Sequence, residues 1–128
     1  MITNEDMKVL LKSQQGEMDA LLMYRELAKV VKDEKDKEVF LQLASEEGHH
    51  AQVFKRYTNK VLKPKSTKAI FVPLMYRIIG KKKLYPTIAK GEYDAEKKYI
   101  SVVKKFPDVE SVMNDERRHG DMVLELLK

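Results

Sequence analysis

The chain has 128 residues, no cysteine and a formal net charge of +5 at pH 7. This length suits one domain that buries a core without disulfides. The absence of cysteine excludes iron–sulfur clusters and thiolate iron sites, so electrons for any redox chemistry must come from another molecule. The first residues mix charged and apolar side chains and form no secretory signal, which predicts a cytoplasmic location.

Lysines supply most of the positive charge and are spread along the chain, apart from one run at residues 81–83. Nucleic-acid binding usually needs basic residues gathered on one face, together with aromatic side chains or a reading helix. The sequence shows neither feature. We therefore expect no nucleic-acid partner and interpret the lysines as a solvated surface.

Glycine and proline are scarce and lie between segments of helical periodicity, which predicts an all-α fold. The first helix begins after Thr3, with Asp6 completing a partial capping box, and runs to about Asp33. Residues 33–36 form a short charged turn to a second helix, whose apolar stripe reaches Val61. These helices make a first helix pair over residues 4–60.

A partly helical crossover is expected over residues 61–83. Its most apolar part, residues 69–80, contains Pro73 and Arg77 and is shorter than the roughly 20 residues of a membrane-spanning helix. We interpret it as a buried connector, through which two copies could pair as a homodimer, and expect no transmembrane segment. The alternative is association with a membrane surface, because the lysine run is adjacent.

The second helix pair covers residues 84–127. Pro107 separates its two helices, and Asp108 is expected to cap the last one. The chain is thus predicted to be one domain over residues 1–128, an antiparallel four-helix bundle with one long crossover.

Two motifs each occur twice. Gly-Glu-x-Asp-Ala-x-x-x-Tyr spans residues 16–24 and 91–99, and acid-Glu-x-x-His spans residues 46–50 and 115–119. This order indicates a duplicated helix pair. The repeats supply four glutamates and two histidines, namely Glu17, Glu47, His50, Glu92, Glu116 and His119.

All six side chains fall on apolar stripes that alternate steps of three and four residues, the spacing of packed bundle helices. A buried, ionised carboxylate costs about several kcal/mol unless it is paired or binds a metal, and these stripes contain no lysine or arginine. Glu and His three residues apart on a helix can bind the same ion. The stripes therefore predict bound cations. The donor types suit iron and manganese and do not exclude zinc.

Residues beside the predicted ligands have alternative interpretations. Tyr24 and Tyr99 lie two turns beyond Glu17 and Glu92. They are interpreted either as core aromatics or as hydroxyl donors to ligand carboxylates. Glu46 and His49 form a second Glu-x-x-His pair, which points about 100° away from the apolar stripe, or seam, of its helix. We expect His49 to be exposed or to contact a ligand, and not to bind the metal.

The motifs resemble those of rubrerythrins and related ferritin-like di-iron carboxylate proteins over nearly the whole chain. The resemblance rests on residues 16–24 and 46–51 in the first half, and on residues 91–92 and 115–120 in the second. It implies a ferritin-like bundle with two iron ions, terminal ligands Glu17 and Glu92, bridging ligands Glu47 and Glu116, and one of His50 and His119 on each ion. The crossover is also similar to ferritin-like domains that precede vacuolar-iron-transporter-type membrane segments.

The resemblance implies an oxidoreductase that acts on peroxide or dioxygen, or oxidises Fe(II), with an external rubredoxin-like protein or flavoprotein as electron donor. Two features depart from the family pattern. Ala95 stands where rubrerythrins commonly carry a further carboxylate, and the rubredoxin domain that they commonly carry is absent. The alternatives are a non-enzymatic iron-binding or iron-sensing module, and a metal-free bundle with buried acids.

Overall fold

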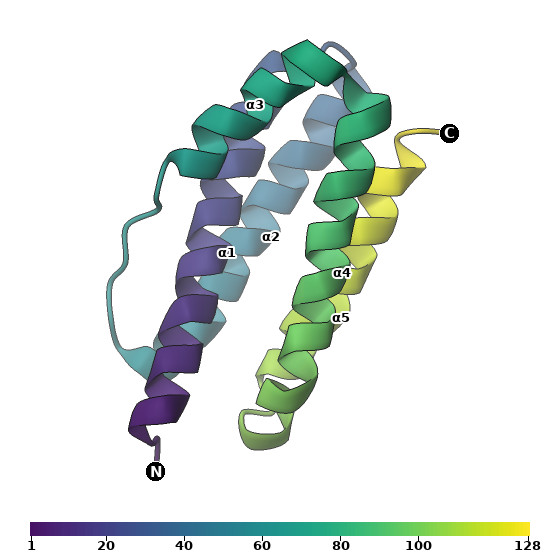
Figure 1. Ribbon diagram of the computed structural model, residues 1–128. Helices are drawn as coiled ribbons and strands as arrows, with labels where there is room; N and C mark the ends of the chain where they lie inside the picture. The colour runs from purple at the N-terminus through teal and green to yellow at the C-terminus, as the bar shows by residue number, and fades with distance from the viewer.

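The computed structural model describes residues 1–128 and contains only helices, which confirms the predicted all-α, ferritin-like bundle. The helices are α1 (Asn4–Val30), α2 (Glu34–Thr58), α3 (Thr67–Ile79), α4 (Lys81–Lys105) and α5 (Val109–Glu125). Figure 1 shows two long antiparallel pairs, α1 with α2 and α4 with α5, joined by a crossover that returns along the bundle. Helix α3 forms the upper part of this crossover and packs on the outside of α1.

Capping residues determine where the first two helices begin. Asp6 N–H donates to the Thr3 hydroxyl and Thr3 N–H donates to the Asp6 carboxylate, both at 3.0 Å, as the capping box predicted. Helix α1 ends before the predicted Asp33, because Val31 is already extended. Asp33 instead caps α2 by accepting a hydrogen bond from Lys35 N–H at 2.9 Å. The predicted charged turn is therefore mostly the first turn of α2.

Two other helix boundaries and one helix cap differ from those predicted. Asn59 adopts a left-handed conformation, φ 54°, which ends α2 and leaves Val61 exposed outside the helix. Gly80, with φ 76°, separates α3 from α4, so α4 begins ahead of the predicted residue 84. Asp108 precedes α5, but its side chain makes no capping bond because its backbone is helical, φ −62° and ψ −18°, instead of extended.

The core consists of two apolar clusters, one towards each end of the bundle. In the cluster that α3 covers, the Tyr24 and Phe40 rings stack at 5.8 Å, and Tyr85 meets Phe40 edge-on at 5.2 Å. In the other cluster, the Phe54 and Tyr99 rings lie 5.4 Å apart. These clusters hold the middle turns of the four long helices at a fixed separation.

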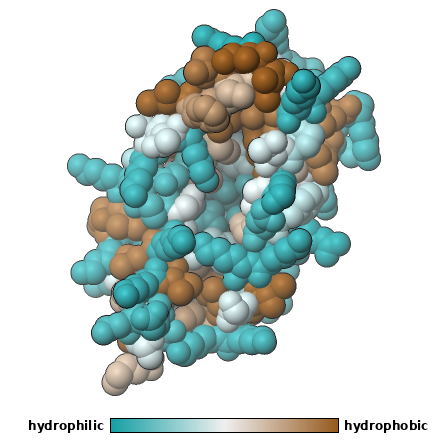
Figure 2. All heavy atoms as spheres, in the orientation of Figure 1, coloured by the Kyte–Doolittle hydropathy of each residue, from teal (hydrophilic) through white to brown (hydrophobic).

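Helix α3 is not the buried connector that its composition predicted. Ala69 and Pro73 are buried, whereas Ile70, Phe71 and Ile78 are 68%, 57% and 66% exposed. A helix packed on the outside of a bundle can bury only one stripe, and α3 carries apolar residues on both sides. The brown area over the upper end of the molecule in Figure 2 is the result. No helix in the structure combines the length and apolar character needed to span a membrane.

Candidate metal centre

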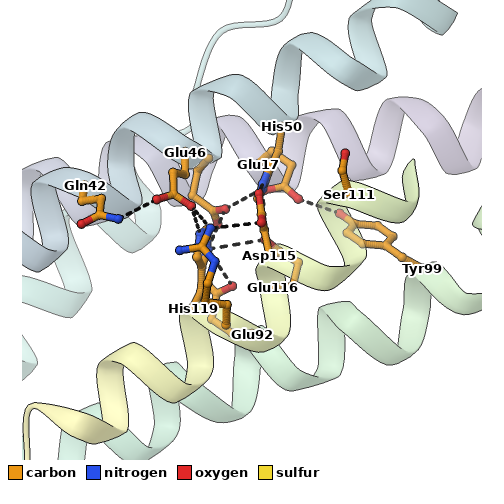
Figure 3. A network of polar contacts seen from close by, with 12 residues as sticks. Glu17, Gln42, Glu46, His50, Glu92, Tyr99, Ser111, Asp115, Glu116 and His119 are labelled. Atoms are coloured by element: carbon orange, nitrogen blue, oxygen red, sulfur yellow. Dashed lines mark hydrogen bonds and ion pairs between the residues drawn. The ribbon is translucent and has the colours of Figure 1, made fainter. Parts of the chain in front are cut away.

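The six predicted ligand residues come together in the middle of the bundle. Helices α1 and α4 each contribute one glutamate, and α2 and α5 each contribute one Glu-x-x-His pair. All six side chains are buried, and the most exposed, Glu92, is 6% exposed. Figure 3 shows Glu17, His50, Glu92, Glu116 and His119 directed toward one another from these four helices.

Two overlapping groups of four donors lie in this cluster, and the donor atoms of each group lie within 4.8 Å of one another. The first group is Glu17, Glu47, His50 and Glu116, and the second is Glu47, Glu92, Glu116 and His119. Two glutamates, Glu47 and Glu116, belong to both groups. The cluster could therefore hold two cations that share two carboxylates.

The Nδ1 atoms of both histidines face the carboxylates. His50 Nδ1 lies 2.9 Å from Glu47 Oε1 and 3.1 Å from Glu116 Oε1, and His119 Nδ1 lies 3.2 Å from Glu47 Oε1. Five of the inward-facing atoms nevertheless have no hydrogen-bond partner: Glu47 Oε1, His50 Nδ1, Glu92 Oε2, Glu116 Oε1 and His119 Nδ1. Buried polar atoms are rarely unpaired. Five that face one centre fit a cation site.

The other ring nitrogen of each histidine, Nε2, is hydrogen-bonded to a carboxylate. His50 Nε2 donates to Asp115 Oδ2 at 2.8 Å, and His119 Nε2 donates to Glu46 Oε1 at 2.9 Å. Because an ionised carboxylate can only accept, these bonds place a proton on Nε2 and leave the Nδ1 lone pair of a neutral ring for a metal. Arg118 binds both carboxylates. Partial burial raises the pKa of Glu46, but the bonds from Arg118 and His119 outweigh it and lower the pKa to about 2.

Sequence reasoning did not assign this role to Glu46 and Asp115, although a signal was present. In both copies an acid directly precedes the glutamate of the Glu-x-x-His pair. The preceding residue points about 100° away from its own seam, which brings it to the histidine of the neighbouring helix. His49 is exposed and takes no part in the cluster.

The tyrosines of the repeated motif bond reciprocally between α1 and α4. Tyr24 OH donates to Glu92 Oε1 at 2.5 Å, and Tyr99 OH donates to Glu17 Oε1 at 3.0 Å. Burial and the adjacent carboxylates raise the pKa of both phenols well above the usual value. Both hydroxyls therefore stay protonated and hold one oxygen of each glutamate.

The electrostatics of the cluster favour bound cations. Burial and repulsion from Glu47 raise the pKa of Glu17 to about 8, and burial and repulsion from Glu17 raise the pKa of Glu116 to about 11. Burial lowers the pKa of His119, but the carboxylates of Glu47 and Glu92 outweigh it and raise the pKa to about 10. In the absence of cations these groups hold protons at neutral pH, and a bound cation would displace them.

A cavity of about 430 Å³ between α1, α3 and α4 extends to this cluster. Small residues of the repeated motif line it, namely Gly16 and Ala20 on α1 and Gly91 and Ala95 on α4. A Cβ atom added at Gly16 or Gly91 would meet nothing within 4 Å. The small side chains therefore keep open a route that ends at Glu17 and Glu92.

The comparisons with known proteins agree with this arrangement. The rubrerythrin family model matches residues 8–127, which include both copies of both motifs. Searches of curated proteins and of solved structures found no match. With its duplicated motifs at the centre of a four-helix bundle, the chain belongs to the rubrerythrin family.

Proposed function

We propose that the protein binds two iron ions and is an oxidoreductase of rubrerythrin type that acts on peroxide or dioxygen. The observation that supports this best is the set of five buried donor atoms that face one centre without hydrogen-bond partners. Carboxylate oxygens and imidazole nitrogens suit Fe(II) and Mn(II) and also allow Zn(II). Bound iron would supply the redox chemistry.

Each cation would have one histidine and one terminal glutamate of its own. Glu17 and His50 belong to one donor group, and Glu92 and His119 to the other. The two glutamates common to both groups, from α2 and α5, would bridge. This assignment uses each unpaired atom and leaves no carboxylate of the cluster without a cation.

The chain's own residues would position the ligands and admit the substrate. Tyr24 and Tyr99 each hold one oxygen of a terminal glutamate, and Glu92 Oε2 remains unpaired on the cluster side. The cavity leads to these glutamates and is large enough for peroxide or dioxygen. Since the chain has no cysteine, we expect electrons from an external rubredoxin-like protein or flavoprotein.

A non-enzymatic iron-binding or iron-sensing module is the second candidate, and Ala95 favours it. Ala95 lines the cavity one turn after Glu92, where a rubrerythrin commonly carries a further carboxylate. Without that carboxylate, α4 offers the cluster one acid in place of two. The donor set would still hold two cations, but its redox reactivity would differ.

Turnover distinguishes the two candidates. We would load the protein anaerobically with Fe(II), add hydrogen peroxide with a chemical reductant present, and follow repeated peroxide consumption. Multiple cycles per protein support the oxidoreductase, and a single slow oxidation supports the binding module. The same assay is run on His50→Ala, which removes a proposed ligand. The matched control is His49→Ala, because His49 is adjacent and exposed. A protein that takes up neither Fe(II) nor Mn(II) in stoichiometric amounts would reject both candidates.

A further inference from the structure

The charges of the chain are segregated around its crossover. Residues 51–91 contain eleven lysines and arginines and no aspartate or glutamate. All 20 acidic residues lie in the rest of the chain. This basic segment includes α3 and both of its connections.

The exposed apolar face of α3 lies within this basic segment. Ile70, Phe71, Leu74 and Ile78 recur at helical spacing and are 50–68% exposed. The other side of α3 packs on the bundle, and Tyr76 OH accepts a hydrogen bond from the backbone N–H of Lys32 at 3.1 Å. We call the four exposed residues the α3 face. It is fixed to the bundle and directed outward (Figure 2).

Cations flank the α3 face along the chain. Lys68 precedes it, Arg77 lies within it, and Lys82 and Lys83 follow Gly80; all four cations are exposed. The nearby Lys81 is the one that pairs with an acid, since its Nζ lies 3.3 Å from Asp36. The flanking cations are thus free to meet negative charge from another body.

We propose that the α3 face docks on the surface of an anionic lipid bilayer. Apolar side chains set between lysines bind such a surface through buried apolar area and through attraction to anionic headgroups. A second copy of the chain is a less favourable occupant, because a two-fold dimer through this face would bring two basic segments together. Phe71 and Lys68 also line the cavity, so docking sets its mouth against the bilayer.

Vesicle flotation tests this proposal with the whole chain. We expect the protein to float with phosphatidylglycerol-containing vesicles and not with pure phosphatidylcholine, and to dissociate as salt is raised. Each lysine near an anionic surface contributes about fivefold in affinity. The variant Lys82→Glu/Lys83→Glu should therefore bind at least about tenfold more weakly, and Ile70→Ser/Leu74→Ser should lose binding.

Matched surface variants on α4 keep the test specific. Ile100→Ser removes an apolar side chain that is 53% exposed, and Lys97→Glu/Lys104→Glu reverses two exposed lysines outside the basic segment. Circular dichroism checks that each variant is folded. No flotation, equal binding to both vesicle types, or equal losses in the α4 variants would overturn the proposal. A dimer that Ile70→Ser/Leu74→Ser dissociates, without vesicle binding, would assign the face to a second copy.

Discussion

The two faces of the central cluster are built differently, although both come from duplicated sequence. On the α2/α5 face, Glu46 and Asp115 bind the outer histidine nitrogens, and Arg118 joins the two carboxylates. On the α1/α4 face, small residues line a cavity, and no Cα atom of α1 lies within 8 Å of one in α4. One face is closed by ion pairs and the other is open.

The two repeated motifs therefore have different structural roles. Both copies of acid-Glu-x-x-His lie on α2 and α5, where they build the closed face that fixes the histidine rings. Both copies of Gly-Glu-x-Asp-Ala-x-x-x-Tyr lie on α1 and α4, where they build the open face. We therefore expect changes at Glu46 and Asp115 on the closed face to alter metal affinity, and changes at the small residues of the open face to alter access.

The largest effect should come from the cluster that both faces share. A cation present at 100 times its Kd stabilises the folded state by about 3 kcal/mol. We expect Fe(II) or Zn(II) to raise the Tm of the wild type and of His49→Ala, and not that of His119→Ala. An equal rise in the Tm of His119→Ala would show that His119 is not a ligand. A different result would favour a metal-free bundle: no effect of metal on the wild type, together with a Tm of metal-free His119→Ala above that of the metal-free wild type.

The closed face is tested next. Asp115→Ala removes the acceptor for His50 Nε2, and loss of such a partner typically costs about 10–100-fold in metal affinity. Competition with a chelator measures this loss. Asp94→Ala is the control, because Asp94 pairs only with Lys90 at the surface. Equal affinities in the two variants would show that the closed face does not support the histidines.

Filling the open face should separate access from binding. Ala95→Leu places a larger side chain in the cavity and replaces no predicted ligand. We expect slower oxidation of the bound Fe(II) by peroxide in stopped-flow measurements, with metal stoichiometry unchanged. A variant that oxidises at the wild-type rate would indicate that peroxide enters by another route.

Two helical glycines, one lining the open face and one in the α4/α5 interface, should respond to alanine with opposite signs. Gly16 lies within α1 and faces open space, so Gly16→Ala should stabilise the protein by about 1 kcal/mol. A Cβ at Gly120, on α5, would lie 2.5 Å from the Tyr93 ring, so Gly120→Ala should destabilise by about 1–3 kcal/mol. Urea denaturation of the metal-free proteins measures both changes. Changes of the same sign in the free energy of unfolding of both variants would contradict this prediction.

The smallest effect concerns the ion pair that ties α1 to α4 at one end of the open face. Hydrogen bonds from Lys105 and Thr3 lower the pKa of Asp6 from 3.8 to about 2. A lowered pKa stabilises the fold above pH 3.8, and this contribution is lost as the pH falls through about 2. Asp6→Asn should therefore lower the Tm at neutral pH and match the wild type near pH 2. A constant difference in Tm would show that the carboxylate charge is not responsible.

Features set by local periodicity could be predicted from sequence. The seam positions of Glu47 and His50 follow from the helical repeat, because steps of three and four residues put both on the stripe that faces the bundle axis. The capping box at Thr3 is equally local. The convergence of the six side chains needed only the further assumption that the four stripes share one core.

Features that depend on how helices lie against each other could not be predicted. Glu46 leaves its own seam, and only the position of α5 beside α2 shows that it meets His119. Whether α3 buries one apolar stripe or two depends on its place outside the bundle, so Ile70 could not be assigned from composition. The end of α2 depends on a left-handed Asn59, a conformation that asparagine adopts only in some contexts.

Metal content combined with an anomalous-scattering map tests the central proposal most directly. We expect two ions per chain inside the bundle, both bound by Glu47 and Glu116, with one contacting His50 Nδ1 and the other His119 Nδ1. Crystals grown with Fe(II) or Mn(II) that show no ion in the cluster, or ions only on the outer Nε2 side, would contradict it.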